Sequence, residues 1–407
     1  MDAFLNPFRP GAGYPPPHLA GREKEIEQFL RLLQQKPILK NLVITGLRGV
    51  GKTVLLEELK TKAISSGWFW AGTDLSESAS ISEQNLSIRI LTDLSTLISS
   101  FTFVEEDKAP IGFGKKPETV EHKLNYSTLY TMYVATPGLE ADKLKAVLEF
   151  IWTIVKSRVT GIVLAYDEAQ ILKDRAEDRQ FPLSLLLEII QFMQRKEIPY
   201  LLVLTGLPTL VNTLSEARTY SERMFEIITL KQLGERETKD AILVPIQKEK
   251  CPVTFTPYGI NEIIKHSSGY PYFIQFYCKE TFDSILQQIN VGVEKPDVRI
   301  ADFVRKLDVD FYAARWSRVT DRQRELLVVI AKLATANDEF TAKEISQKSN
   351  EVLDNPFAPA YVVNSLNKLT AQGLIFKNRR GKYSFAVPLL ADYINRSNEE
   401  IEDDFLL

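Results

Sequence analysis

The chain has 407 residues, of which 44% are hydrophobic, and its 53 acidic and 50 basic side chains give a formal net charge of −3. This length predicts about two to four domains, and the balanced charge excludes nucleic-acid binding over the whole surface, leaving only a local patch. Two cysteines and three scattered histidines exclude a disulfide framework and a four-ligand zinc centre.

Residues 1–20 are rich in proline and glycine and predict an extended arm. From residue 21 to 230, apolar runs with β-branched residues alternate with amphipathic helical patterns, which predicts an α/β core with a parallel sheet covered on both faces. Residues 101–138 fit neither pattern and are interpreted as an insertion. The strands are predicted at 41–45, 68–74, 161–166, 200–205 and 225–230, and the helices at 23–33, 51–65, 85–98, 139–159, 183–195 and 208–217.

Strand patterns stop after residue 230, and residues 231–315 contain amphipathic stretches typical of a helical lid subdomain. Residues 316–396 then predict three helices and a two-stranded hairpin, the pattern of a winged helix-turn-helix, with Thr320 and Thr341 as helix caps. Residues 397–407 form an acidic tail.

A glycine-rich segment, Gly-Leu-Arg-Gly-Val-Gly-Lys-Thr at 46–53, matches the P-loop pattern G-x-x-x-x-G-K-[ST] between a predicted strand and a predicted helix. Its glycines allow backbone N–H groups to converge on phosphate oxygens, and the helix directs its positive end at the anion. Lys52 is expected to neutralise the β- and γ-phosphates of ATP, and Thr53 to ligate Mg²⁺. The alternative is a turn that matches by chance. The predicted nucleotide-binding residues of the loop are Gly46, Gly49, Val50, Gly51, Lys52 and Thr53.

A second motif follows the strand predicted at 161–166, where an apolar run ends in Asp167 and Glu168. Asp167 is expected to hold Mg²⁺ together with Thr53, and Glu168 to orient and polarise the attacking water. The alternative is that both carboxylates only cap the next helix. With a P-loop upstream, the pair predicts hydrolysis of ATP to ADP and phosphate.

These motifs, with Ala-Gly-Arg-Glu at 20–23, resemble those of AAA+ ATPases, and the chain is similar to the prokaryotic ATPases between origin-recognition initiators and STAND signalling NTPases. The resemblance covers about residues 15–310 and extends to stretches at 204–208, 240–245 and 269–272. It implies that Gly21 and Arg22 border the adenine and that Thr205 senses the γ-phosphate, although an ordinary strand-end threonine is the alternative.

The resemblance also implies an arginine finger acting in a neighbouring copy, and hence self-association. Arg223 is preferred over Arg218 because it immediately precedes Met224, while a purely solvated role stays open for either arginine. Where a second-sensor arginine is expected, the chain has Gly-Tyr-Pro at 269–271, similar to the G-x-P element of STAND proteins, with Pro271 near the nucleotide. This departure favours a slow nucleotide switch over a fast ring-type cycle.

Residues 317–396 contain twelve Lys/Arg and eight Asp/Glu, which gives this region the local positive charge that double-stranded DNA requires. The third helix presents a polar face formed by Asn364, Ser365, Asn367 and Lys368. The residues predicted to contact DNA are Asn364, Lys368, Lys377, Arg379, Arg380 and Lys382.

Two main functions remain open at this stage, and a transposition-type or toxin-linked ATPase is a weaker third. The favoured one is an ATP-dependent AAA+ switch that couples nucleotide state to DNA binding, and the alternative is a STAND-like signalling or defence NTPase whose winged helix contacts protein. The first residues contain no apolar signal-peptide segment, and no apolar run approaches the ~18 residues that span a bilayer. We therefore expect a cytoplasmic protein without membrane contact.

Overall fold

The computed structural model describes residues 5–11, 13–99, 101–106, 119–249, 253–379 and 381–404; of these, the side chains at 102–122, 248–249, 379 and 399–404 are not described. The chain divides into two compact units. The sheet unit comprises residues 23–45 and 55–229, and the helical unit comprises residues 1–22, 46–54 and 230–407.

A five-stranded sheet forms the centre of the sheet unit. Its strands are β1 (Asn41–Gly46), β2 (Trp68–Ala71), β5 (Gly161–Tyr166), β6 (Tyr200–Gly206) and β7 (Phe225–Leu230), in the order β2-β5-β6-β1-β7. The β2–β5, β5–β6 and β6–β1 pairs are parallel. Strands β1, β5 and β6 are buried along their whole length, as expected where helices cover both faces. The predicted α/β parallel sheet is confirmed.

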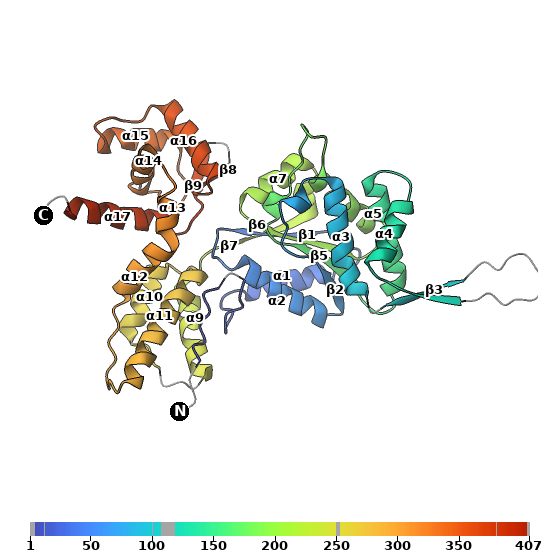
Figure 1. The fold of residues 1–407 in the computed structure, drawn as a ribbon, viewed down its shortest axis with the longest axis horizontal. Helices are drawn as coiled ribbons and strands as arrows, with labels where there is room; N and C mark the ends of the chain where they lie inside the picture. The colour runs from blue at the N-terminus through green and yellow to red at the C-terminus, as the bar shows by residue number, and fades with distance from the viewer. Residues whose placement is uncertain are drawn as a thin grey trace, which may run out of the picture. The chain divides into compact units, whose positions relative to one another are not determined.

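Helices flank the sheet on both sides. They are α1 (Glu23–Leu33), α2 (Lys52–Ser65), α3 (Glu83–Ile98), α4 (Tyr126–Ala135), α5 (Glu140–Val155), α6 (Pro182–Arg195), α7 (Thr209–Ala217) and α8 (Ser221–Met224), with short 3₁₀ turns at Ser78–Ser80 and Ala169–Ile171. Helices α1 and α2 lie on one side, and α3, α5 and α7 on the other (Figure 1). Apolar positions such as Leu186, Ile190 and Met193 of α6 repeat at helical spacing and pack into this core.

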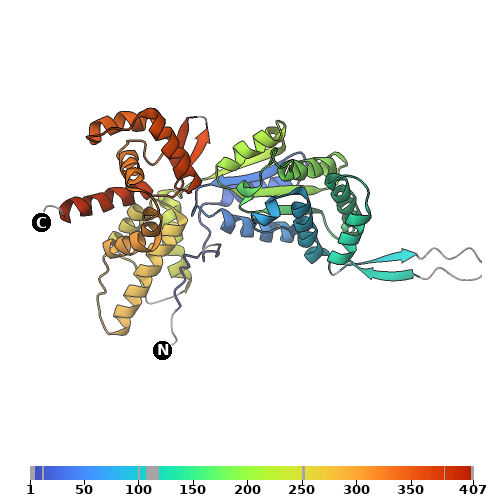
Figure 2. The same cartoon turned by 45° about the horizontal axis from the view of Figure 1, so that its top comes forward.

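The segment interpreted as an insertion has regular structure in its described part. Strands β3 (Thr102–Glu106) and β4 (Thr119–Lys123) form an antiparallel pair that projects from the sheet unit (Figure 2), and α4 follows. Asn125 caps α4 by accepting a hydrogen bond from the Thr128 N–H at 3.0 Å. The sequence did not reveal α4 because its apolar residues do not form one helical stripe.

The helical unit contains the remaining elements. They are α9 (Glu235–Glu249), α10 (Pro257–Ser267), α11 (Pro271–Asn290), α12 (Ile300–Leu307), the π-helical turn η3 (Asp308–Ala313), α13 (Ala314–Trp316), α14 (Asp321–Ala331), α15 (Ala342–Val352), α16 (Pro359–Ala371), β8 (Ile375–Arg379), β9 (Lys382–Phe385) and α17 (Leu390–Asp404). Thr320 and Thr341 form capping boxes with Gln323 and Glu344, as expected. Helix α17 extends through the predicted acidic tail as far as Asp404.

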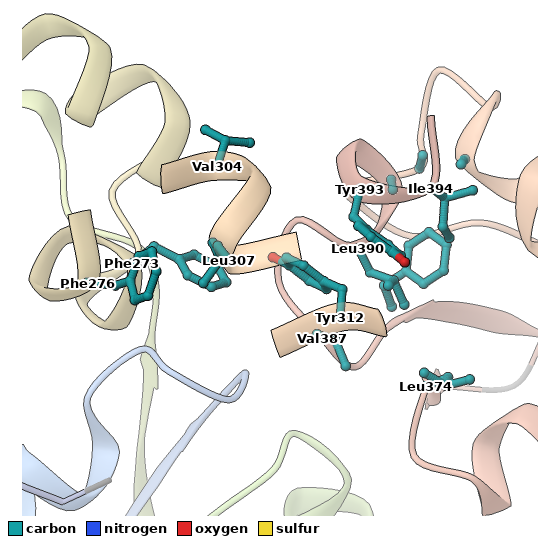
Figure 3. Packing of buried hydrophobic residues seen from close by; sticks show 14 of the residues in the cluster. Phe273, Phe276, Val304, Leu307, Tyr312, Leu374, Val387, Leu390, Tyr393 and Ile394 are labelled. Atoms are coloured by element: carbon teal, nitrogen blue, oxygen red, sulfur yellow. The ribbon is translucent and has the colours of Figure 1, made fainter. Parts of the chain in front are cut away.

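One continuous apolar core joins the lid helices to the C-terminal elements (Figure 3). Tyr312 of η3 stacks on Tyr393 of α17 with ring centroids 4.9 Å apart, and its hydroxyl donates to the Pro388 carbonyl at 2.9 Å. Beside them, the guanidinium of Arg396 donates to both carboxylate oxygens of Asp308 at 2.6 and 3.0 Å. This packing ties α12–α13 to α17. The residue limits predicted for the separate domains stay a prediction.

The proline- and glycine-rich arm packs on the lid helices. Phe8 is 2% exposed and contacts the rings of Phe255 and Phe282. Nearby, the Asn6 side-chain amide donates to the Lys279 carbonyl at 3.0 Å. The arm is therefore held by burial of one aromatic side chain and by hydrogen bonds, although residues 5–11 contain no helix or strand.

Candidate nucleotide-binding site

The glycine-rich loop lies between the end of β1 at Gly46 and the start of α2 at Lys52. Gly49 and Gly51 adopt φ values of 78° and 91°, which L side chains rarely adopt. A side chain at Gly46 would place its Cβ 2.7 Å from the Leu230 carbonyl oxygen. Glycine is thus required at these positions, and left-handed residues of this kind let successive N–H groups form an anion-binding concavity.

Lys52, the lysine of the motif, points back into the loop. Its Nζ donates to the carbonyls of Gly46 and Leu47, both at 3.0 Å, and the residue is 8% exposed. The neighbouring Thr53 is half-buried in the first turn of α2. The loop therefore holds an ammonium group and a hydroxyl beside a helix N-terminus, a donor set that suits phosphate oxygens and their Mg²⁺.

Arg22, predicted to border the adenine, braces the loop. Its guanidinium donates to the carbonyls of Val50 at 3.0 Å and Lys231 at 2.9 Å, and it is 5% exposed. The preceding Gly21 has φ +64°, and its Cβ would lie 2.7 Å from Glu237 Cγ. The structure thus brings Arg22 and Val50 together at the loop, and the adenine-binding role stays a prediction.

The Gly-Tyr-Pro segment brings the start of α11 to the same loop. Gly269 has φ +74°, and its Cβ would be 2.2 Å from the Leu233 carbonyl oxygen, so only glycine fits. Pro271 occupies the first turn of α11, where its missing N–H costs nothing. The next N–H, that of Tyr272, donates to the Gly49 carbonyl at 3.3 Å. The lid helix therefore begins in contact with the P-loop.

In the sheet unit, the Asp-Glu pair immediately follows β5. Asp167 is 2% exposed, and its Oδ1 accepts hydrogen bonds from the Glu168 N–H at 2.7 Å and from the Thr205 hydroxyl. Thr205 is fully buried near the end of the adjacent strand β6. The structure thus brings Thr205 and Asp167 together, and the hydroxyl of the predicted γ-phosphate sensor donates to the carboxylate of the predicted metal ligand.

Glu168 is exposed and held in an unusual backbone conformation. Its φ of 52° lies in the left-handed region, which is unfavourable for a non-glycine residue and occurs preferentially at functional sites. The Gln170 amide donates to the Glu168 carboxylate, and its carbonyl oxygen accepts from the Leu207 N–H at 3.0 Å. Gln170 therefore orients the predicted catalytic carboxylate, a role that its residue type alone does not reveal.

Asp74 is a third acidic residue near this pair that the sequence motifs do not include. The segment after β2 passes close to β5 because Gly72 has no side chain; its Cβ would lie 1.7 Å from the Ala165 carbonyl oxygen. The backbone of Asp74 then forms an isolated parallel β-bridge with that of Asp167. Partial burial, and next the charges of Asp167 and Glu168, raise the pKa of Asp74. Negative charge therefore accumulates at the end of β5.

Replacing Asp74 by asparagine is expected to raise the melting temperature of the nucleotide-free protein at neutral pH. Ionised Asp74 is disfavoured in the folded protein and therefore lowers the free energy of unfolding. This destabilisation is fully present above the raised pKa and disappears as the pH falls below the ordinary value of 3.8. Thermal melts from pH 7 downward should show a gain that shrinks with acidity. The control is Asp178→Asn, which changes an exposed acid on the loop of residues 172–181, and a pH-independent gain for Asp74→Asn would contradict the electrostatic cause.

Few of the described groups are suited to hold a metal alone: no cluster of three or more His, Cys, Asp or Glu side chains with suitable geometry occurs among them. Mg²⁺ in nucleotide sites keeps several waters and takes one or two carboxylates together with phosphate oxygens. The Thr53 hydroxyl and the Asp167 carboxylate are each hard oxygen ligands of the kind that Mg²⁺ takes.

The two arginines considered as fingers differ in their surroundings. Arg218 lies 3.7 Å from the Glu188 carboxylate and lines a cavity of about 640 Å³ with Asp174 and Ser184. Arg223 is exposed on the short helix α8, and within the described part of the chain its side chain forms no hydrogen bond or ion pair. Arg223 is therefore the one available to another molecule.

The predicted DNA-binding residues lie on α16 and the β8–β9 hairpin. Asn364, Asn367 and Lys368 are exposed on α16, but Ser365 is only 4% exposed, so its prediction as part of the polar face was wrong; it faces the core one turn before Leu369. On the hairpin Lys377 is exposed and Lys382 is half-buried. Arg380 and the side chain of Arg379 lie outside the described residues.

Comparison with known families shows which domain the residues of the site resemble. Residues 18–204 match the model of the AAA ATPase domain, a range that contains the P-loop, Asp167 and Glu168. Residues 18–204 are therefore similar to an AAA ATPase domain. A second model, Domain of unknown function (DUF8462), matches residues 309–394. No curated protein matches the chain.

Solved structures extend the likeness beyond the AAA ATPase domain. A Walker-type ATPase of Pyrococcus abyssi is 14% identical with a TM-score of 0.56, over 93% of this chain and 96% of that one. The ORC2 protein of Aeropyrum pernix, in ADPNP-ADP complexes, is 15% identical with a TM-score of 0.53, over 98% of each chain. At these identities the likeness shows that the chain shares its fold with these two proteins. No helix in the described part of the chain is long and apolar enough to cross a bilayer.

Proposed function

We propose that the protein is a Mg-ATP-dependent switch that hydrolyses ATP slowly to ADP and phosphate. The observation that carries the proposal is the P-loop, with Lys52 buried in it, within residues that match the AAA ATPase domain and in which Asp167 and Glu168 directly follow β5. The P-loop follows β1, and β1 and β5 run parallel within one sheet, so both motifs leave the same edge. The ORC2 structure of similar fold contains ADPNP and ADP, which supports a nucleotide as ligand.

The roles of the residues follow from their chemistry. Lys52 and the loop N–H groups bind and neutralise the phosphates, while Thr53 and Asp167 hold the Mg²⁺ that shields the charge developing on the phosphate oxygens. Glu168, exposed and oriented by Gln170, accepts a hydrogen bond from the attacking water and aligns it with the γ-phosphate. Arg223 acts as a finger in a second copy, which is the self-association we propose.

We further propose that residues 316–396 form a winged helix that binds double-stranded DNA. Helices α14, α15 and α16 followed by the hairpin β8–β9 have the element order of that module, and Phe340 adds an antiparallel bridge to Tyr383. The exposed Asn364 and Lys368 suit base edges, and Lys377 suits phosphates.

One observation favours the second candidate, a STAND-like switch whose C-terminal module contacts protein. Tyr361 and Val363 are 37% and 40% exposed and lie on opposite edges of the solvent face of α16 that carries Asn364. Aromatic and apolar groups are typical of the centre of protein interfaces. Binding to DNA and binding to a protein therefore compete for one helix face, and salt dependence separates them.

The wing variant Arg379→Ala/Arg380→Ala is expected to weaken binding to all duplexes alike, because phosphate contacts carry no base information. Three or four neutralised phosphates imply a slope of log K against log salt of about −3 to −4, and the double variant should flatten it by about one to two. Gel shifts or anisotropy over a salt series measure both quantities.

The control is Arg236→Ala/Arg299→Ala, which removes the same charge from exposed sites on α9 and just before α12 and should leave the slope unchanged. Equal, weak binding of the wild type and the wing variant with the same slope would reject DNA binding and leave the signalling candidate in its place.

A further inference from the structure

Arg315 is half-buried on the short helix α13, after the lid and outside the residues that match the AAA ATPase model. Its guanidinium lies 4.4 Å from the centre of the Phe311 ring and donates to the Phe311 carbonyl. The side chain is therefore ordered by its own turn of chain and does not extend freely into solvent.

An aromatic layer connects this position to the P-loop. The Phe311 ring centre lies 5.4 Å from that of Tyr272, the residue whose N–H donates to the Gly49 carbonyl. The Tyr272 Cβ also lies 3.3 Å from where a Cβ on Gly49 would be, so the two residues are in close contact. Arg315, Tyr272 and the P-loop all belong to the helical unit.

The P-loop contributes a second arginine on this side. Arg48 is exposed, and its Nη1 lies 3.9 Å from the position of a Cβ on Gly373, which lies between α16 and the hairpin. Burial, and next the positive charge of Arg48, lower the pKa of Arg315. Within the described residues neither Arg48 nor Arg315 forms an ion pair with a carboxylate. Two mutually repelling cations thus lie beside a loop built for anions.

The two arginines are expected to favour the state with a bound anion over the state without one. Like charges without counter-ions disfavour each other, and a polyphosphate at the P-loop would remove that repulsion and accept charge-assisted hydrogen bonds from a planar guanidinium. The Gly-Tyr-Pro segment has no arginine where a second sensor is expected, and Arg315 is placed beside the same loop by a segment about 45 residues later in the chain.

We propose that Arg315 binds the terminal phosphates of the nucleotide and so acts as a phosphate sensor supplied by the segment between the lid and the C-terminal module. This inference rests on the proposed nucleotide binding. It also gives the switch a physical link, because the adjacent Tyr312 packs on Tyr393 of α17 in the core shared with the C-terminal elements. A change in the contact between Arg315 and the phosphates is therefore transmitted to the C-terminal elements through η3 and α13.

The test is isothermal titration of the full chain with Mg-ATP and with Mg-ADP. Loss of a charge-assisted contact predicts that Arg315→Ala weakens ATP binding by roughly 10- to 100-fold and ADP binding by clearly less. Arg315→Lys keeps the positive charge but lacks the planar set of guanidinium N–H donors, so it should recover part of the lost ATP affinity. Arg318→Ala is the matched control, because it removes the same charge from an exposed site three residues further on and should leave both affinities unchanged.

Three other outcomes overturn the inference, each in a different way. Wild-type affinity for ATP in both Arg315 variants would reject Arg315 as a sensor while leaving the nucleotide site intact. An equal loss in Arg318→Ala would show a general charge effect without a contact. Failure of the wild type to bind Mg-ATP would reject the proposed function, and the sensor with it. Arg315→Ala relieves the repulsion of Arg48 but also removes the contact with the Phe311 ring, so a cooperative thermal melt of the nucleotide-free variant above the titration temperature separates lost binding from lost folding.

Discussion

Replacement of Lys52 by alanine is expected to abolish nucleotide binding. The variant removes the ammonium group that the loop holds against the Gly46 and Leu47 carbonyls, where it would neutralise phosphates. Wild-type protein should gain about 2.7 kcal/mol of folding stability at a hundredfold excess of Mg-ATP over Kd, and Lys52→Ala should gain none. Thermal melts with and without Mg-ATP measure this difference.

Lys60→Ala is the control for this experiment. Lys60 lies on the same helix α2, its side chain is 43% exposed, and it pairs only weakly with Glu57 at 3.4 Å. Its loss should leave the nucleotide-induced shift unchanged. A wild-type protein whose melting temperature does not respond to Mg-ATP would reject the nucleotide site as a whole.

Replacement of Glu168 by glutamine is expected to preserve nucleotide affinity and to reduce hydrolysis by about 10²- to 10⁴-fold. The amide keeps the size of the side chain but cannot accept the proton of the attacking water, while Asp167 and Thr53 still hold the metal. Single-turnover phosphate release measures the hydrolysis, and titration with Mg-ATP measures the affinity.

Glu177→Gln, at an exposed position on the loop after β5, is the matched control and should hydrolyse ATP at the wild-type rate. Equal turnover of Glu168→Gln and the wild type would mean that Glu168 only orders the turn at Ala169–Ile171, for which its left-handed φ already provides a structural reason. A joint loss of affinity and turnover would instead indicate a damaged fold.

The sequence predicted the features that depend only on residues close together in the chain. The run before Asp167 is apolar throughout and therefore forms a strand buried on both faces, and the P-loop pattern predicts its own strand–turn–helix context. The capping boxes at Thr320 and Thr341 were readable because a cap and its partner are only three residues apart. Local chemistry of this kind needs no tertiary contact to be recognised.

Predictions based on a single face or segment were weaker. Ser365 is polar but buried, because a helical position is assigned to core or solvent by what packs on it and not by its residue type. The regular structure of α4 and of the β3–β4 pair was also missed, since the apolar residues of neither segment repeat at a clear helical or strand period. Gln170 stands two residues after Glu168, yet only the fold shows that its amide joins that carboxylate to the Leu207 N–H.

By itself, the sequence determined the parallel α/β class, the position of the P-loop and the Asp-Glu pair, because these depend on residue periodicity and on spacings of a few residues. Only the tertiary structure brought Asp74 to Asp167, Tyr272 to Gly49, and Arg315 to the P-loop side of the lid. These partners are separated by tens to hundreds of residues. Such contacts depend on chain packing and loop closure, which leave no fixed spacing in the sequence.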